Sequence, residues 1–199
     1  MMDYKILVTI IIGAVLVNNY VLRQFLGVCP FLGVSKDLKG TIGMSVAIIF
    51  VMLLATAVTW PIQIFLLDPN GLAFLQTIVF ILVIATLVQL VEIILKKYIP
   101  SLYKLLGIYL PLMTTNCAIF AVTIVNIKNE YSYIESLVNA FGSGFGFMLG
   151  MVIFSGIREY TQNTDPPQAF KGLPLTLISA AILSFSFFGF NGVMDNLFK

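Results

Sequence analysis

Five long stretches without a charged side chain set the strongest limit on what this chain can fold into. They cover residues 40–67, 71–91, 105–127, 136–157 and 172–194. A helix needs about 20 apolar residues to cross the hydrocarbon core of a bilayer, so each stretch is long enough to span it. Only 10% of the residues are charged, whereas a soluble domain carries about 25%. The sequence therefore predicts an all-α polytopic membrane protein with no appreciable soluble domain.

The first 35 residues predict a sixth transmembrane segment whose helix is broken. Between Ile6 and Ser35 the only charged residue is Arg23, and a continuous helix of that length would measure about 45 Å. This is too long for one span and too short for two. The stretch also contains polar or helix-breaking residues at Asn18, Asn19, Gly27, Pro30 and Gly33. Non-helical backbone at membrane depth is tolerated only where protein or water satisfies it, so we expect the break to line a functional site.

The apolar run that follows Lys5 is also compatible with a cleaved signal peptide. It lacks the small residues of a cleavage site, so we expect the first helix to be retained as a span. The alternative is a protein of five spans with a cleaved or peripheral first segment.

The distribution of basic residues predicts the orientation in the membrane. With six spans, one side carries eight of the eleven basic residues, namely Arg23, Lys36, Lys39, Lys96, Lys97, Lys104, Arg158 and Lys171. The other side carries Lys5, Lys128 and Lys199. Because cytoplasmic loops are enriched in lysine and arginine, we expect both termini to lie outside the cytoplasm.

The two cysteines suggest an internal repeat. Cys29 opens the sequence CPFLGV and Cys117 opens CAIFAV, and each half of the chain contains three predicted spans. An odd number of spans per half places the halves in opposite orientations, which is the inverted-repeat architecture of many transporters. We expect residues 1–99 to form the first inverted repeat and residues 100–199 the second, with broken helices at the cysteine sites.

Cys29 and Cys117 are the first candidates for chemistry. The simplest interpretation is that each is a small, inert, buried side chain. A functional role in an apolar site would ordinarily require a metal, because burial otherwise keeps a thiol protonated. Iron–sulfur clusters commonly take four cysteine ligands, whereas this chain has two cysteines and no histidine.

Polar residues lie close to both cysteines within otherwise apolar spans. They are Asn18, Asn19, Thr114, Thr115 and Asn116. They could form hydrogen bonds between helices, line an ion pathway, or donate hydrogen bonds to the ligands of a cluster. Glu92 could act within the membrane, but its position four residues before Lys96 favours an interfacial pair.

The segment GSGFGFMLG, residues 142–150, resembles a phosphate-binding loop only superficially, because no lysine follows it. Gly142, Gly146 and Gly150 recur every four residues and so share one helix face, which favours close helix packing. The net charge of +2, with no basic run, argues against binding of nucleic acid.

Four segments of the chain carry a resemblance to a known family. They are LVNNYVLRQFLGVCPFLGVSK, TIVFILVIATLVQLVE, LGIYLPLMTTNCAIF and SGIRE. Over its whole length the chain resembles the membrane subunits RnfA, RnfE, NqrD and NqrE of ion-translocating oxidoreductases. The NNY and CPFLG motifs are most similar to the RnfA branch, whereas GSGFGF is closer to NqrE.

The resemblance implies a specific fold, cofactor and set of partners. It implies six helices in two inverted halves in the bacterial cytoplasmic (inner) membrane. Cys29 and Cys117 would be two ligands of a [2Fe–2S] cluster, and a homologous RnfE-like subunit of opposite topology would supply the other two. The Rnf complex passes electrons between ferredoxin and NAD and moves sodium ions or protons. Its subunits RnfB, RnfC, RnfD and RnfG would be further partners, with flavins only in other subunits.

Three other functions are compatible with the same residues. The chain could be the equivalent subunit of a sodium-pumping NADH:quinone oxidoreductase. It could be a solute transporter or ion channel, since inverted repeats and broken helices also occur there. It could also be a scaffold for flavin-containing partners in which both cysteines are inert. Iron analysis and an EPR spectrum of the purified complex discriminate among these classes.

Overall fold

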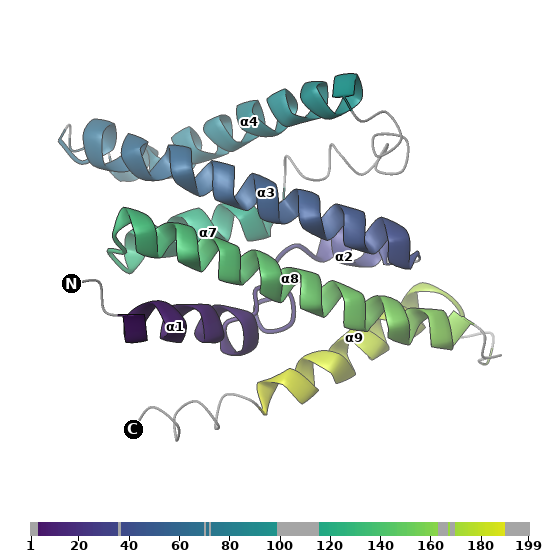
Figure 1. Ribbon diagram of the computed structural model, residues 1–199. Coiled ribbons are helices and arrows are strands. Elements are labelled where there is room, and N and C mark those ends of the chain that lie inside the picture. Colours follow the sequence, from purple (N-terminus) through teal and green to yellow (C-terminus); the bar gives the residue numbers. More distant parts are fainter. Residues whose placement is uncertain are drawn as a thin grey trace.

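The computed structural model describes residues 4–35, 37–69, 71, 73–98, 116–162, 167 and 170–189, and every regular element among them is helical. The elements are α1 (Tyr4–Ile12), η1 (Gly13–Val17), α2 (Val28–Val34), α3 (Leu38–Ile62), η2 (Gln63–Leu67), η3 (Ala73–Leu75), α4 (Gln76–Tyr98), α7 (Cys117–Lys128), α8 (Tyr133–Gln162) and α9 (Leu173–Phe188). The predicted all-helical class is confirmed. Figure 1 shows the helices running in broadly the same direction, forward or backward.

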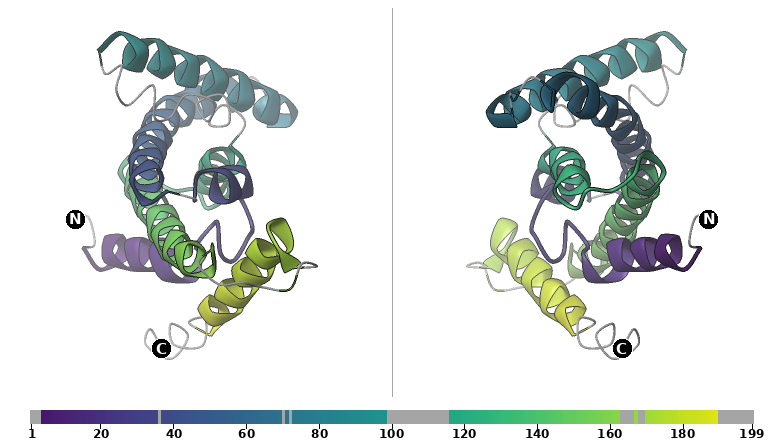
Figure 2. Two further views of the ribbon diagram at one scale, coloured as in Figure 1. Left: turned by 90° about the vertical axis from the view of Figure 1, so that its right-hand side faces the viewer. Right: turned by 90° about the vertical axis from the view of Figure 1, so that its left-hand side faces the viewer.

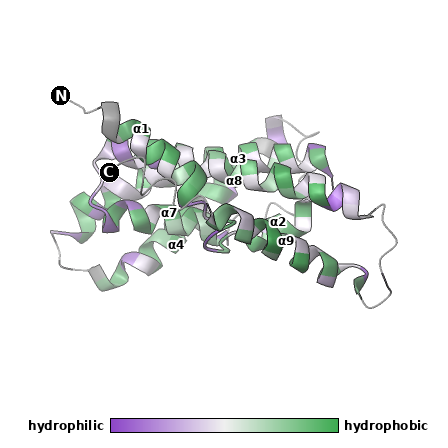
Figure 3. Ribbon diagram, turned by 90° about the horizontal axis from the view of Figure 1, so that it is seen from below, coloured by the Kyte–Doolittle hydropathy of each residue, from purple (hydrophilic) through white to green (hydrophobic). Residues whose placement is uncertain are grey.

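Three of the described helices are long and apolar enough to cross a bilayer. They are Leu38–Leu67, Gln76–Tyr98 and Tyr133–Thr161, and three shorter apolar helices cover Leu7–Val17, Cys117–Lys128 and Leu173–Phe188. Apolar residues cover most of their length (Figure 3). The predicted stretch 105–127 is represented only by its second part, because residues 105–115 lie outside the described residues. The arrangement as six spans in two inverted halves remains a prediction.

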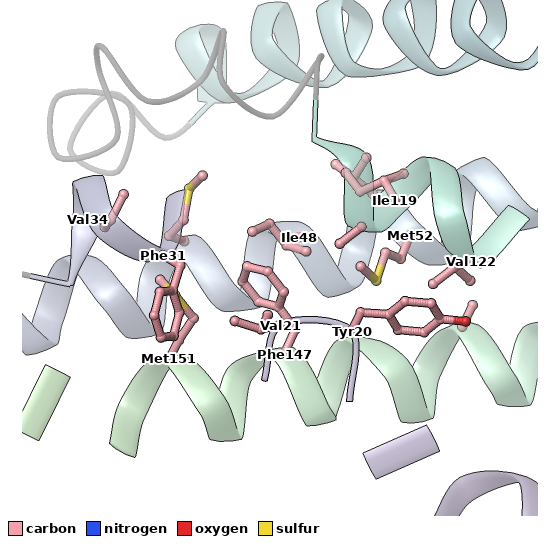
Figure 4. Packing of buried hydrophobic residues seen from close by; sticks show 14 of the residues in the cluster. Tyr20, Val21, Phe31, Val34, Ile48, Met52, Ile119, Val122, Phe147 and Met151 are labelled. Carbon is pink, nitrogen blue, oxygen red and sulfur yellow. The ribbon is translucent and has the colours of Figure 1, made fainter. Parts of the chain in front are cut away.

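Helices α3 and α8 form the centre of the molecule, and they pack along most of their length. Gly144 allows this approach, since a Cβ atom there would lie 2.8 Å from Cγ1 of Ile49 and 3.2 Å from its Cα. The buried apolar side chains between the elements include Ile48 and Met52 of α3, Ile119 and Val122 of α7, and Phe147 and Met151 of α8 (Figure 4). Tyr20 and Val21, from the non-helical segment after η1, complete this cluster.

The first transmembrane segment is broken, as the sequence predicted. Helix α1 widens into the π-helical turn η1, whose last hydrogen bond joins the Asn18 N–H to the Gly13 oxygen at 2.7 Å. Residues 18–27 are not helical, and α2 begins after Gly27, whose φ of +76° is readily adopted only by glycine. Figure 1 shows α2 continuing in the direction of α1 but displaced from its axis.

The end-on views in Figure 2 show how the elements surround the break. Helices α4, α3, α8 and α9 follow one another along an arc, and α2 and α7 lie inside it. No described helix covers α2 and α7 on the open side of the arc (Figure 2).

The described basic residues gather at the end of the molecule where α2 and α4 end, as expected for cytoplasmic loops. Lys39 is near the start of α3, Lys96 and Lys97 are in the last turn of α4, and Arg158 is near the end of α8. Arg23 is an exception. Its assignment to a loop between spans is wrong, because the helix breaks before it and Arg23 lies in the non-helical segment between η1 and α2.

Candidate functional site

The break and the start of α7 bring the two cysteine-bearing segments together. Cys29 is the second residue of α2 and Cys117 the first residue of α7. The Gly27 N–H donates a hydrogen bond to Sγ of Cys117 at 2.9 Å, across 90 residues of sequence. From this meeting point α2 runs toward one end of the molecule and α7 toward the other (Figure 1). Both cysteines are free thiols and both are exposed.

Gly27 makes this meeting possible. A Cβ atom there would lie 2.7 Å from Cε2 of Phe147, 3.1 Å from Oδ1 of Asn116 and 3.3 Å from Cβ of Ala118. No side chain fits that space, so the backbone of residue 27 lies directly against α7 and α8. The sequence marked Gly27 as a helix breaker, whereas its contact with the second cysteine carried no local signal.

Asn116 is the N-cap of α7. Its Oδ1 accepts a hydrogen bond from the Ala118 N–H at 3.0 Å, which satisfies one of the free N–H groups at a helix start. The side chain is buried, and its Nδ2 has no partner within the described part of the chain. Thr114 and Thr115, predicted with Asn116 to act in the same site, lie outside the described residues.

Asn19 holds the broken segment together. Its Oδ1 accepts hydrogen bonds from the N–H groups of Val21 and Leu22 at 3.1 and 3.2 Å. Its Nδ2 donates to the Gly146 oxygen at 2.6 Å and to the Val15 oxygen at 3.3 Å. One buried amide therefore replaces hydrogen bonds that the helix loses at the break. The geometry gives Asn19 a structural task and places no atom of it against a cysteine.

Asn18 behaves differently from its neighbour. It is exposed, and its Oδ1 accepts a hydrogen bond from the Arg23 guanidinium at 2.7 Å. Asn18 also lines a pocket of about 380 Å³ between the first segment, α7 and α8. Its polar lining includes Gln24, Asn129 and Asn139, and no charged side chain is among the described residues that line it.

The predicted glycine row faces the first segment. A Cβ atom at Gly142 would lie 3.2 Å from Cβ of Ala14, and one at Gly146 would lie 3.1 Å from the Ala14 oxygen and the Val15 backbone. One at Gly150 would lie 3.4 Å from Cγ of Leu22. These three glycines let α8 approach the backbone of α1, η1 and the break. Gly144, on the neighbouring face of the helix, was missed by the sequence pattern.

The donor set fits half of an iron–sulfur site. Among the described residues no group of three or more His, Cys, Asp or Glu side chains could hold a metal. A [2Fe–2S] cluster usually takes four cysteine thiolates, and the two here are accessible, with a backbone N–H already directed at one sulfur. Hydrogen bonds to cluster sulfurs are one means of tuning a reduction potential.

Known proteins match nearly the whole chain. Residues 7–194 match the family model described as "Rnf-Nqr subunit, membrane protein". The RnfA-type component of the Na(+)-translocating ferredoxin:NAD(+) oxidoreductase complex of Acetobacterium woodii is 52% identical, over 94% of this chain and 97% of its own. The corresponding components of the ion-translocating oxidoreductase complexes of Syntrophotalea carbinolica (52%; 96% and 98% covered) and Edwardsiella ictaluri (46%; 98% and 99% covered) are also similar. This chain therefore belongs to the Rnf-Nqr family of membrane subunits.

Proposed function

We propose that this chain is the RnfA-type component of an ion-translocating ferredoxin:NAD oxidoreductase complex and holds half of an intramembrane [2Fe–2S] cluster. The names of the relatives support the complex. The observation that supports the cluster is the convergence of the Cys29 and Cys117 segments on an exposed site at the centre of the chain. The other two ligands come from a homologous subunit of opposite topology.

The proposed site divides a long electron path. A bound [2Fe–2S] cluster would supply a one-electron relay partway across a hydrocarbon core of about 30 Å. Cys29 and Cys117 would hold their half of it, and the Gly27 N–H would remain on the Cys117 sulfur. The neighbouring apolar side chains, such as Val28 and Ala118, exclude water from that side. RnfB, RnfC, RnfD and RnfG type subunits would hold the remaining carriers, including the flavins.

The two halves of the chain would serve this site symmetrically. In the proposed inverted repeat, α2 from residues 1–99 and α7 from residues 100–199 are corresponding helices that run in opposite directions from the site. The open side of the arc would be covered by the homologous subunit. Exposed apolar side chains elsewhere, for example Ile81 and Ile93 on α4, would face lipid or further subunits.

The cluster is tested by its ligand requirement. Expressed alone, the chain should contain little iron, because it supplies two of four thiolates, whereas co-expression with its homologous partner should give two iron atoms per pair. Cys29→Ser and Cys117→Ser should each abolish or strongly alter the EPR signal and stop ferredoxin-to-NAD electron transfer. Gly156→Ala is the matched control, since a Cβ atom there meets nothing within 4 Å.

The outcomes separate the alternatives. Stoichiometric iron in the chain expressed alone, or a wild-type EPR signal in either serine variant, contradicts the shared cluster. An iron-free but assembled pair would favour the solute transporter or channel. Activity with quinone instead of NAD would identify the NADH:quinone oxidoreductase subunit.

We also propose that Asn18 lines part of the path of the translocated ion. The uncharged polar pocket beside it supports this role, since amide and hydroxyl oxygens suit a hard cation. Asn18→Leu should reduce ion transport per electron without removing the EPR signal. Unchanged transport in that variant would count against an ion path through this pocket.

A further inference from the structure

One face of α8 follows the segment that carries Cys29 from its beginning to its end. Phe147 lies against Gly27. Phe154 stacks on Phe31 with ring centroids 4.0 Å apart and an interplanar angle of 19°. Arg158, one turn further, reaches the end of α2. Side chains at these spacings share one face of a helix, so α8 forms a continuous support for α2.

Arg158 contacts the C-terminal end of α2 through two hydrogen bonds. Its guanidinium donates to the Leu32 oxygen at 2.5 Å and to the Ser35 hydroxyl at 2.8 Å. Leu32 carries one of the last four carbonyl groups of α2, which have no acceptor role within the helix. A cation is also favourable at a helix C-terminus, where the carbonyl dipoles leave partial negative charge. Ser35 is fully buried, so this contact is not a loose surface pair.

Helix α2 depends on such contacts for its position. It has only seven residues, and an isolated helix of this length is not stable. Its first residues have no side-chain cap within the described part of the chain, and Gly27 before it is held by packing and the bond to Cys117. Cys29 precedes Leu32 by three residues, which is less than one helical turn. The clamp at one end of α2 is therefore about one turn away from the sulfur at the other.

We propose that Arg158 is a positioning residue that fixes the place of Cys29 by clamping the last turn of α2. This role rests on the proposed function of Cys29 as a ligand. Loss of the guanidinium leaves two buried acceptors without their donor, so the last turn of α2 opens and the helix shifts along the face of α8. The thiolate at its other end moves with it.

The test uses the purified complex that contains this chain. In Arg158→Met, amide hydrogen exchange in residues 31–35 should become about tenfold faster, the change expected on losing one charge-assisted hydrogen bond. The EPR signal of the cluster should shift or broaden in the same variant. Arg158→Lys keeps the charge and one donor geometry and should restore part of both properties. Lys39→Met removes a positive charge at the same end of the molecule and should change neither.

Each outcome decides between specific claims. Unchanged exchange in Arg158→Met contradicts the clamp, and faster exchange with a wild-type EPR signal shows that the clamp does not position Cys29. If Arg158→Met does not assemble, Ser35→Ala removes one of the two contacts and should give a smaller change in the same direction. A wild-type complex without any cluster signal refutes the proposed function, while the exchange measurement still tests the clamp.

Discussion

The glycines of α8 differ sharply in what surrounds them. A Cβ atom at Gly146 would meet three backbone atoms at 3.1 Å, whereas one at Gly156 would meet nothing within 4 Å. Backbone atoms cannot rotate away as a side chain does, so extra volume at Gly146 must separate α8 from the first segment. The same substitution therefore has opposite effects at two positions of one helix.

We predict that Gly146→Ala destabilises the folded chain by about 1–3 kcal/mol, the usual cost of overpacking. Gly156→Ala should be neutral or stabilising by up to about 1 kcal/mol, since alanine is the better helix former. Thermal unfolding of both variants in the same detergent measures the difference. Equal melting temperatures would mean that the close approach at Gly146 is not required.

Single residues also mark what the sequence could and could not reveal. Asn18, Asn19 and Gly27 predicted a break in the first span, because polar and flexible residues inside an apolar stretch disrupt a helix. The Gly146 oxygen that Asn19 binds lies 127 residues away, and no local pattern encodes such a partner. Arg158 was visible only as a loop charge for the same reason.

At the scale of elements, short helices here are held by groups at their ends. Helix α7 starts at a buried asparagine cap, and α2 ends on an arginine from α8. Helix α8 starts with a reciprocal pair, in which the Ser132 N–H donates to the Glu135 carboxylate at 2.9 Å and the Glu135 N–H donates to the Ser132 hydroxyl at 3.5 Å. This is the capping box that a serine followed three residues later by a glutamate predicts.

We predict that Asn116→Ala and Asn116→Asp have different consequences. Alanine removes the cap of α7 and should cost about 1 kcal/mol of stability, whereas aspartate is an equally good cap and should keep it. Aspartate also places a negative charge beside Cys117, which should make the proposed cluster harder to reduce and lower its midpoint potential. Unfolding and redox titrations measure the two effects separately, and equal stability of both variants would contradict the capping role.

The long apolar helices were predictable because length and composition alone identify them. The five uncharged stretches include most of the described helices α3, α4, α8 and α9. The ends of the helices were harder to predict, since α3 continues through Pro61 into the π-helical turn η2. Packing around a proline, and not the local sequence, decides whether a helix stops there.

At the scale of the whole molecule, the ends of the helices divide into two groups. Lys39, Lys97 and Arg158 lie at one end, whereas α1 begins and α7 ends at the other (Figure 1). The chain's single tryptophan, Trp60, lies at the second end, where its Nε1 donates to the Tyr131 oxygen at 2.9 Å. Tryptophan and tyrosine are enriched at membrane interfaces, which agrees with an interface at this level.

We predict that reporter fusions after Lys97 or Arg158 report the cytoplasm and that a fusion after Lys199 reports the outer side. Trp60 should accordingly be quenched by iodide added outside right-side-out vesicles, and little affected in inverted ones. The reverse pattern in both experiments would show that the orientation predicted from the basic residues is wrong.

The bond between Asn19 and Gly146 also has a consequence for biosynthesis. The nine residues of α1 and five of η1 reach only about 21 Å, so they cannot cross the bilayer unaided. Their packing surface on α8 is synthesised 127 residues later, about 6–25 s at ordinary elongation rates. The first segment must therefore wait in the translocon or at the membrane surface until the fifth one arrives. Ribosome-bound chains arrested near residue 130 should leave a cysteine at Asn18 open to a membrane-impermeant thiol reagent, and chains arrested after residue 190 should protect it.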